Sequence, residues 1–120
     1  MDEMILLVED EFNIRQNIKA LLELEEFTIT DVKNGEEAVS ALEKKHFDLI
    51  ITDVMMTKMN GVELLKHIRS NSKTQAVPVI LITAKPKKEI QNYLEPNKTY
   101  YLAKPFNFES LIASVQKALQ

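Results

Sequence analysis

The chain has no cysteine, only two glycines and no apolar run long enough to cross a bilayer. Without cysteine, a disulfide framework and a zinc–thiolate site are both impossible, which agrees with a reducing cytoplasm. Gly35 and Gly61 cannot form the glycine-rich phosphate loop of a flavin or nucleotide carrier. Because neither a run of about 18 apolar residues nor a secretory leader is seen, we expect a cytoplasmic protein without a membrane partner.

An excess of positive charge is also missing. The 15 Lys and Arg residues are outnumbered by 18 Asp and Glu residues, which gives a formal net charge of -3 and a pI near 5.4. Domains that bind nucleic acid usually carry a basic surface, so we expect no direct nucleic-acid binding. Hydrophobic residues make up 45% of the chain, which is enough for one core at this length. We therefore expect one domain over residues 1–120.

Short apolar segments alternate with segments of helical periodicity along the whole chain. This alternation predicts an α/β doubly wound fold, in which helices cover both faces of a five-stranded parallel sheet. Three of the strand segments are apolar throughout, as central strands must be, whereas the second and fifth are mixed and suit the edges. The expected strands are 4–8, 27–32, 49–51, 79–82 and 100–103, and the five expected helices carry apolar stripes within 14–25, 38–42, 64–68, 86–94 and 111–119.

Polar side chains follow four of these strands. Glu9 and Asp10 come after the first strand, Asp53 closes the third, Thr83 closes the fourth and Lys104 follows the fifth. Ligands of open α/β sheets bind beyond the carboxyl ends of the strands, where the strand order reverses. In the common order 2-1-3-4-5 the first and third strands are neighbours. Three carboxylates would then converge, beside one hydroxyl and one ammonium group.

Three carboxylates in one crevice repel each other unless a cation lies between them. Oxygen ligands without His or Cys favour Mg²⁺, which readily bridges carboxylates to phosphate oxygens. Lys104 is a mobile point charge suited to a phosphoryl group, and Thr83 can donate a hydrogen bond to it. This set of residues predicts phosphoryl transfer to a carboxylate, in which positioning and charge neutralisation provide most of the catalysis.

The same residues carry a family resemblance. The segments "LLVEDE", "DVMMTKMNG", "ILITAK" and "YLAKPF" resemble, in order and spacing, the four motifs of the receiver domain of two-component response regulators. The resemblance covers essentially the whole chain and implies a flavodoxin-like sheet. By position, it implies that Asp53 is the phosphoacceptor, and that Asp10, Asp53 and the backbone carbonyl of Met55 bind Mg²⁺ directly. Glu9 would reach the metal mainly through water.

The resemblance also assigns the residues that respond to the phosphoryl group. Lys104 and Thr83 would contact it, with Ala84 leaving room beside Thr83, and Tyr101 would change rotamer in the active state. The implied partners are a sensor histidine kinase or phosphotransfer protein and a downstream output domain or protein. The chain would catalyse transfer to its own Asp53 and act as a regulator, without being a stand-alone enzyme.

Some positions depart from the family motifs. Thr57 stands where the phosphoacceptor motif usually has proline, which predicts a less rigid loop. Asn97 and Lys98 replace the usual Gly-Ala before the fifth strand, and Pro86 follows the fourth strand unusually early. None of these positions belongs to the acid pocket. All but Thr57 affect the face that normally reports phosphorylation to partners.

Two other functions fit the same fold less well. A receiver-like interaction module that acts without phosphorylation would not need the complete set of acids, threonine and lysine. A phosphohydrolase with an aspartyl nucleophile commonly has a second acid two residues further on, and Met55 occupies that place here. A phosphorylation-dependent switch is the favoured interpretation, and the interaction module is its alternative.

Overall fold

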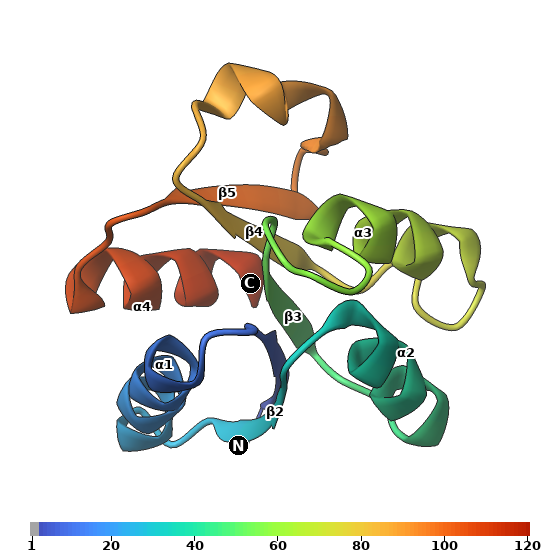
Figure 1. The fold of residues 1–120 in the computed structure, drawn as a ribbon. Coiled ribbons are helices and arrows are strands. Elements are labelled where there is room, and N and C mark those ends of the chain that lie inside the picture. Colours follow the sequence, from blue (N-terminus) through green and yellow to red (C-terminus); the bar gives the residue numbers. More distant parts are fainter. Residues whose placement is uncertain (1–2) are drawn as a thin grey trace.

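The sheet is the centre of the molecule. The structure, a computed structural model, describes residues 3–120 and arranges their strands in one parallel sheet with the order β2-β1-β3-β4-β5 (Figure 1). The predicted fold class and strand order are therefore confirmed, with the two mixed strands at the edges. The strands are β1 (Met4–Val8), β2 (Thr28–Val32), β3 (Leu49–Asp53), β4 (Val79–Thr83) and β5 (Thr99–Ala103).

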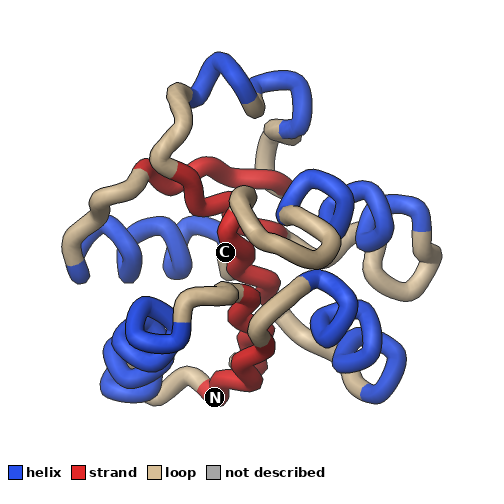
Figure 2. Tube along the Cα trace, in the orientation of Figure 1, coloured by secondary structure: helices blue, strands red, loops and turns tan. Residues whose placement is uncertain are grey.

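Helices pack on both faces of the sheet. The α-helices are α1 (Phe12–Leu24), α2 (Gly35–Lys44), α3 (Gly61–Ser70) and α4 (Phe108–Ala118). In Figure 1, α1 and α4 lie on one side of the strands and α2 and α3 lie on the other, and the tube in Figure 2 shows the strands as a column between them. Over residues 3–120, no helix has the length and apolar character needed to span a bilayer.

Alternate residues along each strand face opposite layers of the core. On β1, Ile5 and Leu7 belong to the cluster that α1 and α4 complete. Leu6 and Val8 belong to the cluster that α2 and α3 complete. Because both faces of β1, β3 and β4 are covered, these strands are apolar almost throughout. The sheet is therefore anchored from both sides, and its strand ends have fixed positions.

Side-chain caps set where the helices begin. Asn34, Asn60 and Asn107 each accept a hydrogen bond from the backbone N–H three residues further on, at 2.8 to 2.9 Å. Asn60 also forms a capping box with Glu63. Glu11 caps α1 in the same way, at 2.7 Å. These bonds satisfy backbone donors that would otherwise be unpaired at a helix start.

The predicted helix at 86–94 is wrong. That segment consists of two short 3-10 turns, η1 (Lys87–Glu89) and η2 (Gln91–Tyr93), so residues 3–120 contain four α-helices where five were expected. The turns are the orange segment that stands away from the sheet in Figure 1. Ile90 is the one fully buried side chain of the segment, so little apolar surface is available to stabilise a regular helix.

Arg69 binds the residues that directly follow this segment. Its guanidinium group pairs with Glu95 at 3.0 Å and donates to the carbonyls of Val77 and Lys98 at 2.6 and 2.9 Å. It also donates to the Thr99 hydroxyl at 2.9 Å. One side chain thus joins the end of α3 to the beginnings of β4 and β5, at the end of the sheet opposite the acidic residues.

Candidate functional site

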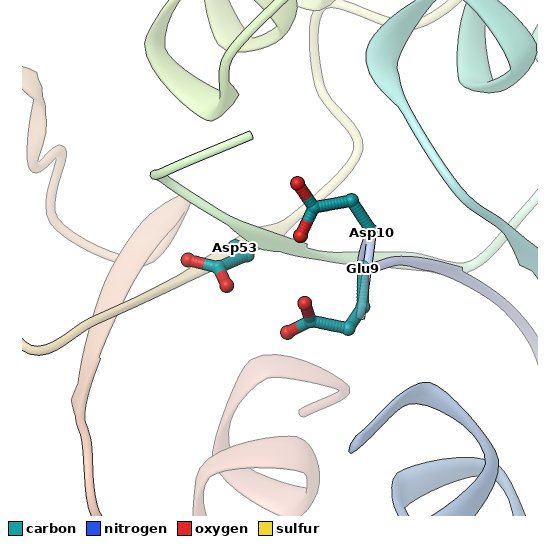
Figure 3. Close-up of side chains that lie close together, drawn as sticks. All are labelled: Glu9, Asp10 and Asp53. Atoms are coloured by element: carbon teal, nitrogen blue, oxygen red, sulfur yellow. The ribbon is translucent and has the colours of Figure 1, made fainter. Parts of the chain in front are cut away.

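The acidic residues meet where β1 and β3 end side by side. Glu9 and Asp10 follow β1, and Asp53 is the last residue of β3 (Figure 3). One carboxylate oxygen of each residue lies within 4.8 Å of those of the other two. Glu9 and Asp53 are buried, at 2% and 4% exposure, whereas Asp10 is exposed. The structure thus brings together the three carboxylates that the strand order predicts to converge.

Asp53 is held by a hydrogen bond on each oxygen. Its Oδ1 accepts from the backbone N–H of Met55 at 3.1 Å. Its Oδ2 accepts from Lys104 Nζ at 2.6 Å, and the same ammonium group lies 3.5 Å from Glu9 Oε1. Lys104 therefore reaches into the acid pocket from the end of β5, and its charge offsets part of the repulsion among the carboxylates.

The pocket shifts the protonation of two of its groups. Burial is the main reason that the pKa of the Glu9 carboxyl is raised to about 7. The charge of Asp53 and a hydrogen bond with it also raise this pKa, whereas the hydrogen bond from the Glu11 N–H and the charge of Lys104 lower it. The pKa of Lys104 is also raised. Burial opposes that shift, but the hydrogen bond and the charge of Asp53, together with Glu9, outweigh it. The pocket therefore favours the protonated form of Glu9 and the charged form of Lys104.

Thr83 and Tyr101 contact the same residue. The Thr83 Oγ1 accepts from the backbone N–H of Lys85 at 3.0 Å, and the Tyr101 hydroxyl donates to the Lys85 carbonyl at 3.2 Å. Thr83 is fully buried at the end of β4, beside Asp53 on β3, and Ala84 next to it is exposed. Within residues 3–120 the Thr83 hydroxyl donates no hydrogen bond to protein, so its proton is free for a ligand.

Two glycines, which composition alone does not connect with this site, shape the loop after Asp53. A Cβ on Gly61 would lie 2.4 Å from the carbonyl oxygen of Asp53, and a Cβ on Gly35 would lie 2.5 Å from the carbonyl oxygen of Met59. Any larger residue would push the loop off the end of β3 or off α2. In the sequence each of these glycines follows an asparagine, a pair typical of turns, whereas the close approach of the two backbones emerges only from the fold.

The residues of the pocket fit a hard divalent cation. Its three clustered ligands are carboxylates, and neither His46 nor His67 belongs to the cluster that residues 3–120 form. Such an all-oxygen set suits Mg²⁺ better than a transition metal. The Met55 N–H bond to Asp53 places the Met55 peptide beside the pocket, and the use of its carbonyl as a ligand stays a prediction. Fold and site together define an open α/β protein with a cluster of three carboxylates, which could hold a cation, at its topological switch point.

Comparison with known proteins identifies the family. A model described as "Response regulator receiver domain" matches residues 5–116, and the chain belongs to this family. The transcriptional regulatory protein CpxR homolog of Haemophilus influenzae is 39% identical over 118 residues, which cover 97% of this chain and 50% of that protein. The chain spans about half the length of the curated relatives that it matches.

Two solved structures show how closely the fold agrees. The chemotaxis response regulator CheY4 of Vibrio cholerae has a TM-score of 0.92 at 31% identity, and the match covers 99% of this chain and 100% of that one. The receiver domain of the sensor histidine kinase PA1611 from Pseudomonas aeruginosa, solved with a magnesium ion coordinated in its active site cleft, has a TM-score of 0.87 at 30% identity. That match covers 99% of this chain and 98% of the other.

Proposed function

We propose that residues 1–120 form a receiver unit that accepts a phosphoryl group on Asp53 and changes its partner-binding face in response. The donor is a phosphohistidine of a sensor histidine kinase or phosphotransfer protein, or a small phosphodonor, and the setting is the cytoplasm. The observation that carries the proposal is the position of Asp53, whose carboxylate lies among two further acids and 2.6 Å from an ammonium group. Family membership supports the same role.

The proposed chemistry is a displacement at phosphorus. A carboxylate oxygen of Asp53 forms a bond to phosphorus while the bond from phosphorus to the donor nitrogen breaks. The electron pair stays on the departing imidazole nitrogen, and the histidine leaves as neutral imidazole because its second ring nitrogen carries a proton. With acetyl phosphate the bond from phosphorus to the acetate oxygen breaks instead, and acetate leaves. In neither case does a proton have to be taken from Asp53, which attacks as the carboxylate. Mg²⁺, when bound, neutralises charge on the transferring oxygens. Glu9, Asp10, Asp53 and the Met55 carbonyl are the residues that would hold it.

Three groups of the chain would then hold the phosphoryl oxygens. Lys104 is already beside Asp53 and can move its ammonium group to a phosphoryl oxygen. Thr83 supplies its free hydroxyl proton, and the small side chain of Ala84 leaves space next to it. When Thr83 turns towards Asp53, the Lys85 N–H loses its acceptor. Tyr101, which holds the same residue by its carbonyl, is then released to change rotamer.

The output follows from this local change. A downstream output domain or protein would bind the face formed by β5 and the 3-10 turns, and its binding would depend on the change in that face. The chain is thus a regulator in this proposal, and its only substrate-like residue is its own Asp53.

Intact-mass measurement tests the proposal directly. With Mg²⁺ and acetyl phosphate, the parent protein should gain one phosphoryl group, about 80 Da. Asp53→Asn should abolish the gain. Asp48→Asn is the matched control, because Asp48 precedes β3 at the opposite end of the sheet and bonds the Met4 N–H. If Asp53→Asn is labelled as well as the parent, the assignment of the acceptor is wrong.

A further inference from the structure

Arg15, on the first turns of α1, joins the acid pocket to the edge of the sheet. Its Nε donates to Asp31 Oδ2 at 3.1 Å, and its Nη1 donates to the backbone carbonyl of Glu9 at 2.8 Å. The side chain is 12% exposed and lies over the ring of Phe12, with 5.4 Å between Cζ and the ring centroid. This guanidinium group is therefore held by hydrogen bonds from two of its nitrogens and by the aromatic ring on one of its planar faces.

The Glu9 carbonyl belongs to the peptide that links Glu9 to Asp10. Within residues 3–120, Arg15 is the one group that donates a hydrogen bond to this carbonyl. The Asp10 carboxylate itself receives no hydrogen bond and forms no ion pair with the described chain. The direction of the Asp10 side chain therefore depends on the backbone of Asp10. Arg15 orients that backbone through its hydrogen bond to the Glu9 carbonyl.

We propose that Arg15 is a positioning residue for the cation site. It fixes the peptide between Glu9 and Asp10, so that both carboxylates point to the site before the cation binds. The inference rests on the proposed function, since it concerns the affinity of the same pocket for Mg²⁺. Groups that orient metal ligands without touching the metal commonly change metal affinity by an order of magnitude or more.

The ion pair with Asp31 does not by itself explain this arrangement. Asp31 also lies 3.2 Å from Lys19 Nζ and accepts from Gln16 Nε2 at 3.1 Å. Burial opposes ionisation of Asp31, yet its pKa is lowered, because Lys19 and Arg15 more than compensate. Asp31 therefore keeps partners when Arg15 is removed. The Glu9 carbonyl does not.

Three variants separate the two roles of Arg15. Arg15→Gln removes the contact to Asp31 and the contact to Glu9. Arg15→Lys keeps the charge, but one ammonium group cannot span both acceptors as the planar guanidinium does. Lys19→Gln is the matched control, because it takes a cation from Asp31 and leaves the Glu9 carbonyl untouched.

Two measurements on the full chain test the inference. Calorimetric titration gives the Mg²⁺ Kd, which should rise roughly 10-fold or more in Arg15→Gln and Arg15→Lys, and by less than about 2-fold in Lys19→Gln. Hydrogen exchange of the metal-free protein follows the Glu11 N–H, which bonds to Glu9 Oε2 at 3.1 Å. Its exchange should accelerate in both Arg15 variants and stay unchanged in Lys19→Gln. Circular dichroism at the titration temperature checks that each variant is folded.

The outcomes distinguish this inference from the proposed function. A parent that binds Mg²⁺ and is labelled on Asp53, together with an Arg15→Gln variant of equal Mg²⁺ Kd, overturns the role of Arg15 alone. Full recovery in Arg15→Lys also overturns it, because charge and not peptide orientation would then matter. A parent that binds no Mg²⁺ overturns both.

Discussion

The unusual protonation of Glu9 makes the stability of the metal-free protein depend on pH in a defined direction. Its pKa is raised from 4.5 to about 7 in the fold, so the folded state binds this proton more tightly than the unfolded chain. The stability from the proton is complete below the unfolded pKa and is lost as pH rises through the folded pKa. A neutral side chain of the same shape should therefore stabilise the protein at high pH and change little at low pH.

The structure gives the size of this effect. Glu9 is 2% exposed, so solvent screens the group only weakly. At 1.36 kcal/mol for each pKa unit, the shift corresponds to about 2–3 kcal/mol between about pH 5 and about pH 8. Glu9→Gln should be more stable than the parent by that amount near pH 8, and the two proteins should have similar free energies of unfolding near pH 5. The amide oxygen can still accept from the Glu11 N–H.

Urea unfolding at several pH values, with EDTA present, measures this difference. Glu23→Gln on the exposed side of α1 removes one negative charge without touching the pocket and serves as the control. It should follow the parent at every pH. Parallel stability curves for Glu9→Gln and the parent would refute the argument, because burial of a charged Glu9 would then carry no free-energy cost.

The remaining predictions concern the metal, the lifetime of the phosphoryl group and local opening. Millimolar Mg²⁺ should raise the Tm of the parent because it binds the folded state, and Asp53→Asn should reduce this rise; a parent Tm indifferent to Mg²⁺ would argue against the pocket. Met55 is apolar and exposed beside Asp53, so it cannot orient water, and Met55→Asn should speed loss of the phosphoryl group. Equal decay rates by mass spectrometry would remove Met55 from this role. In hydrogen exchange, amides 87–94 should be the fastest outside the termini and should gain protection with a phosphoryl mimic. Slow exchange before the mimic is added would show that the turns are already rigid.

Much of the site could be predicted because parallel strands place their carboxyl ends at one edge of the sheet. The uninterrupted apolar runs mark the central strands, and so the residues directly after them must meet. Glu9 and Asp10 follow the central strand β1, Asp53 is the last residue of the central strand β3, and Lys104 follows the edge strand β5. Position along the chain, together with the common strand order 2-1-3-4-5, was therefore enough to predict that they converge, without any knowledge of side-chain contacts.

Contacts between distant elements could not be predicted in this way. Arg15 shows an ordinary helical spacing in the sequence, and its importance arises from the approach of α1 to both Asp31 and the Glu9 carbonyl. The error at 86–94 has a related cause. The spacing of Ile90 and Leu94 suits a helix, but a helix of this length needs tertiary packing, and the fold buries only Ile90 fully.

The two ends of that segment are held in different ways, and this difference bears on how a signal could cross it. At its start, the backbone of Lys85 makes two hydrogen bonds: its N–H donates to the Thr83 hydroxyl, and its carbonyl accepts from the Tyr101 hydroxyl. Thr83 and Tyr101 are the two residues predicted to respond to a phosphoryl group. At its far end, Arg69 fixes Glu95 and the beginning of β5 through charged hydrogen bonds. The intervening 3-10 turns have few buried contacts, so their reorganisation costs less than that of an α-helix packed along its length. A change at Lys85 would therefore be absorbed by the turns before it reaches the region held by Arg69, which confines the altered surface to the turns and the neighbouring face of β5.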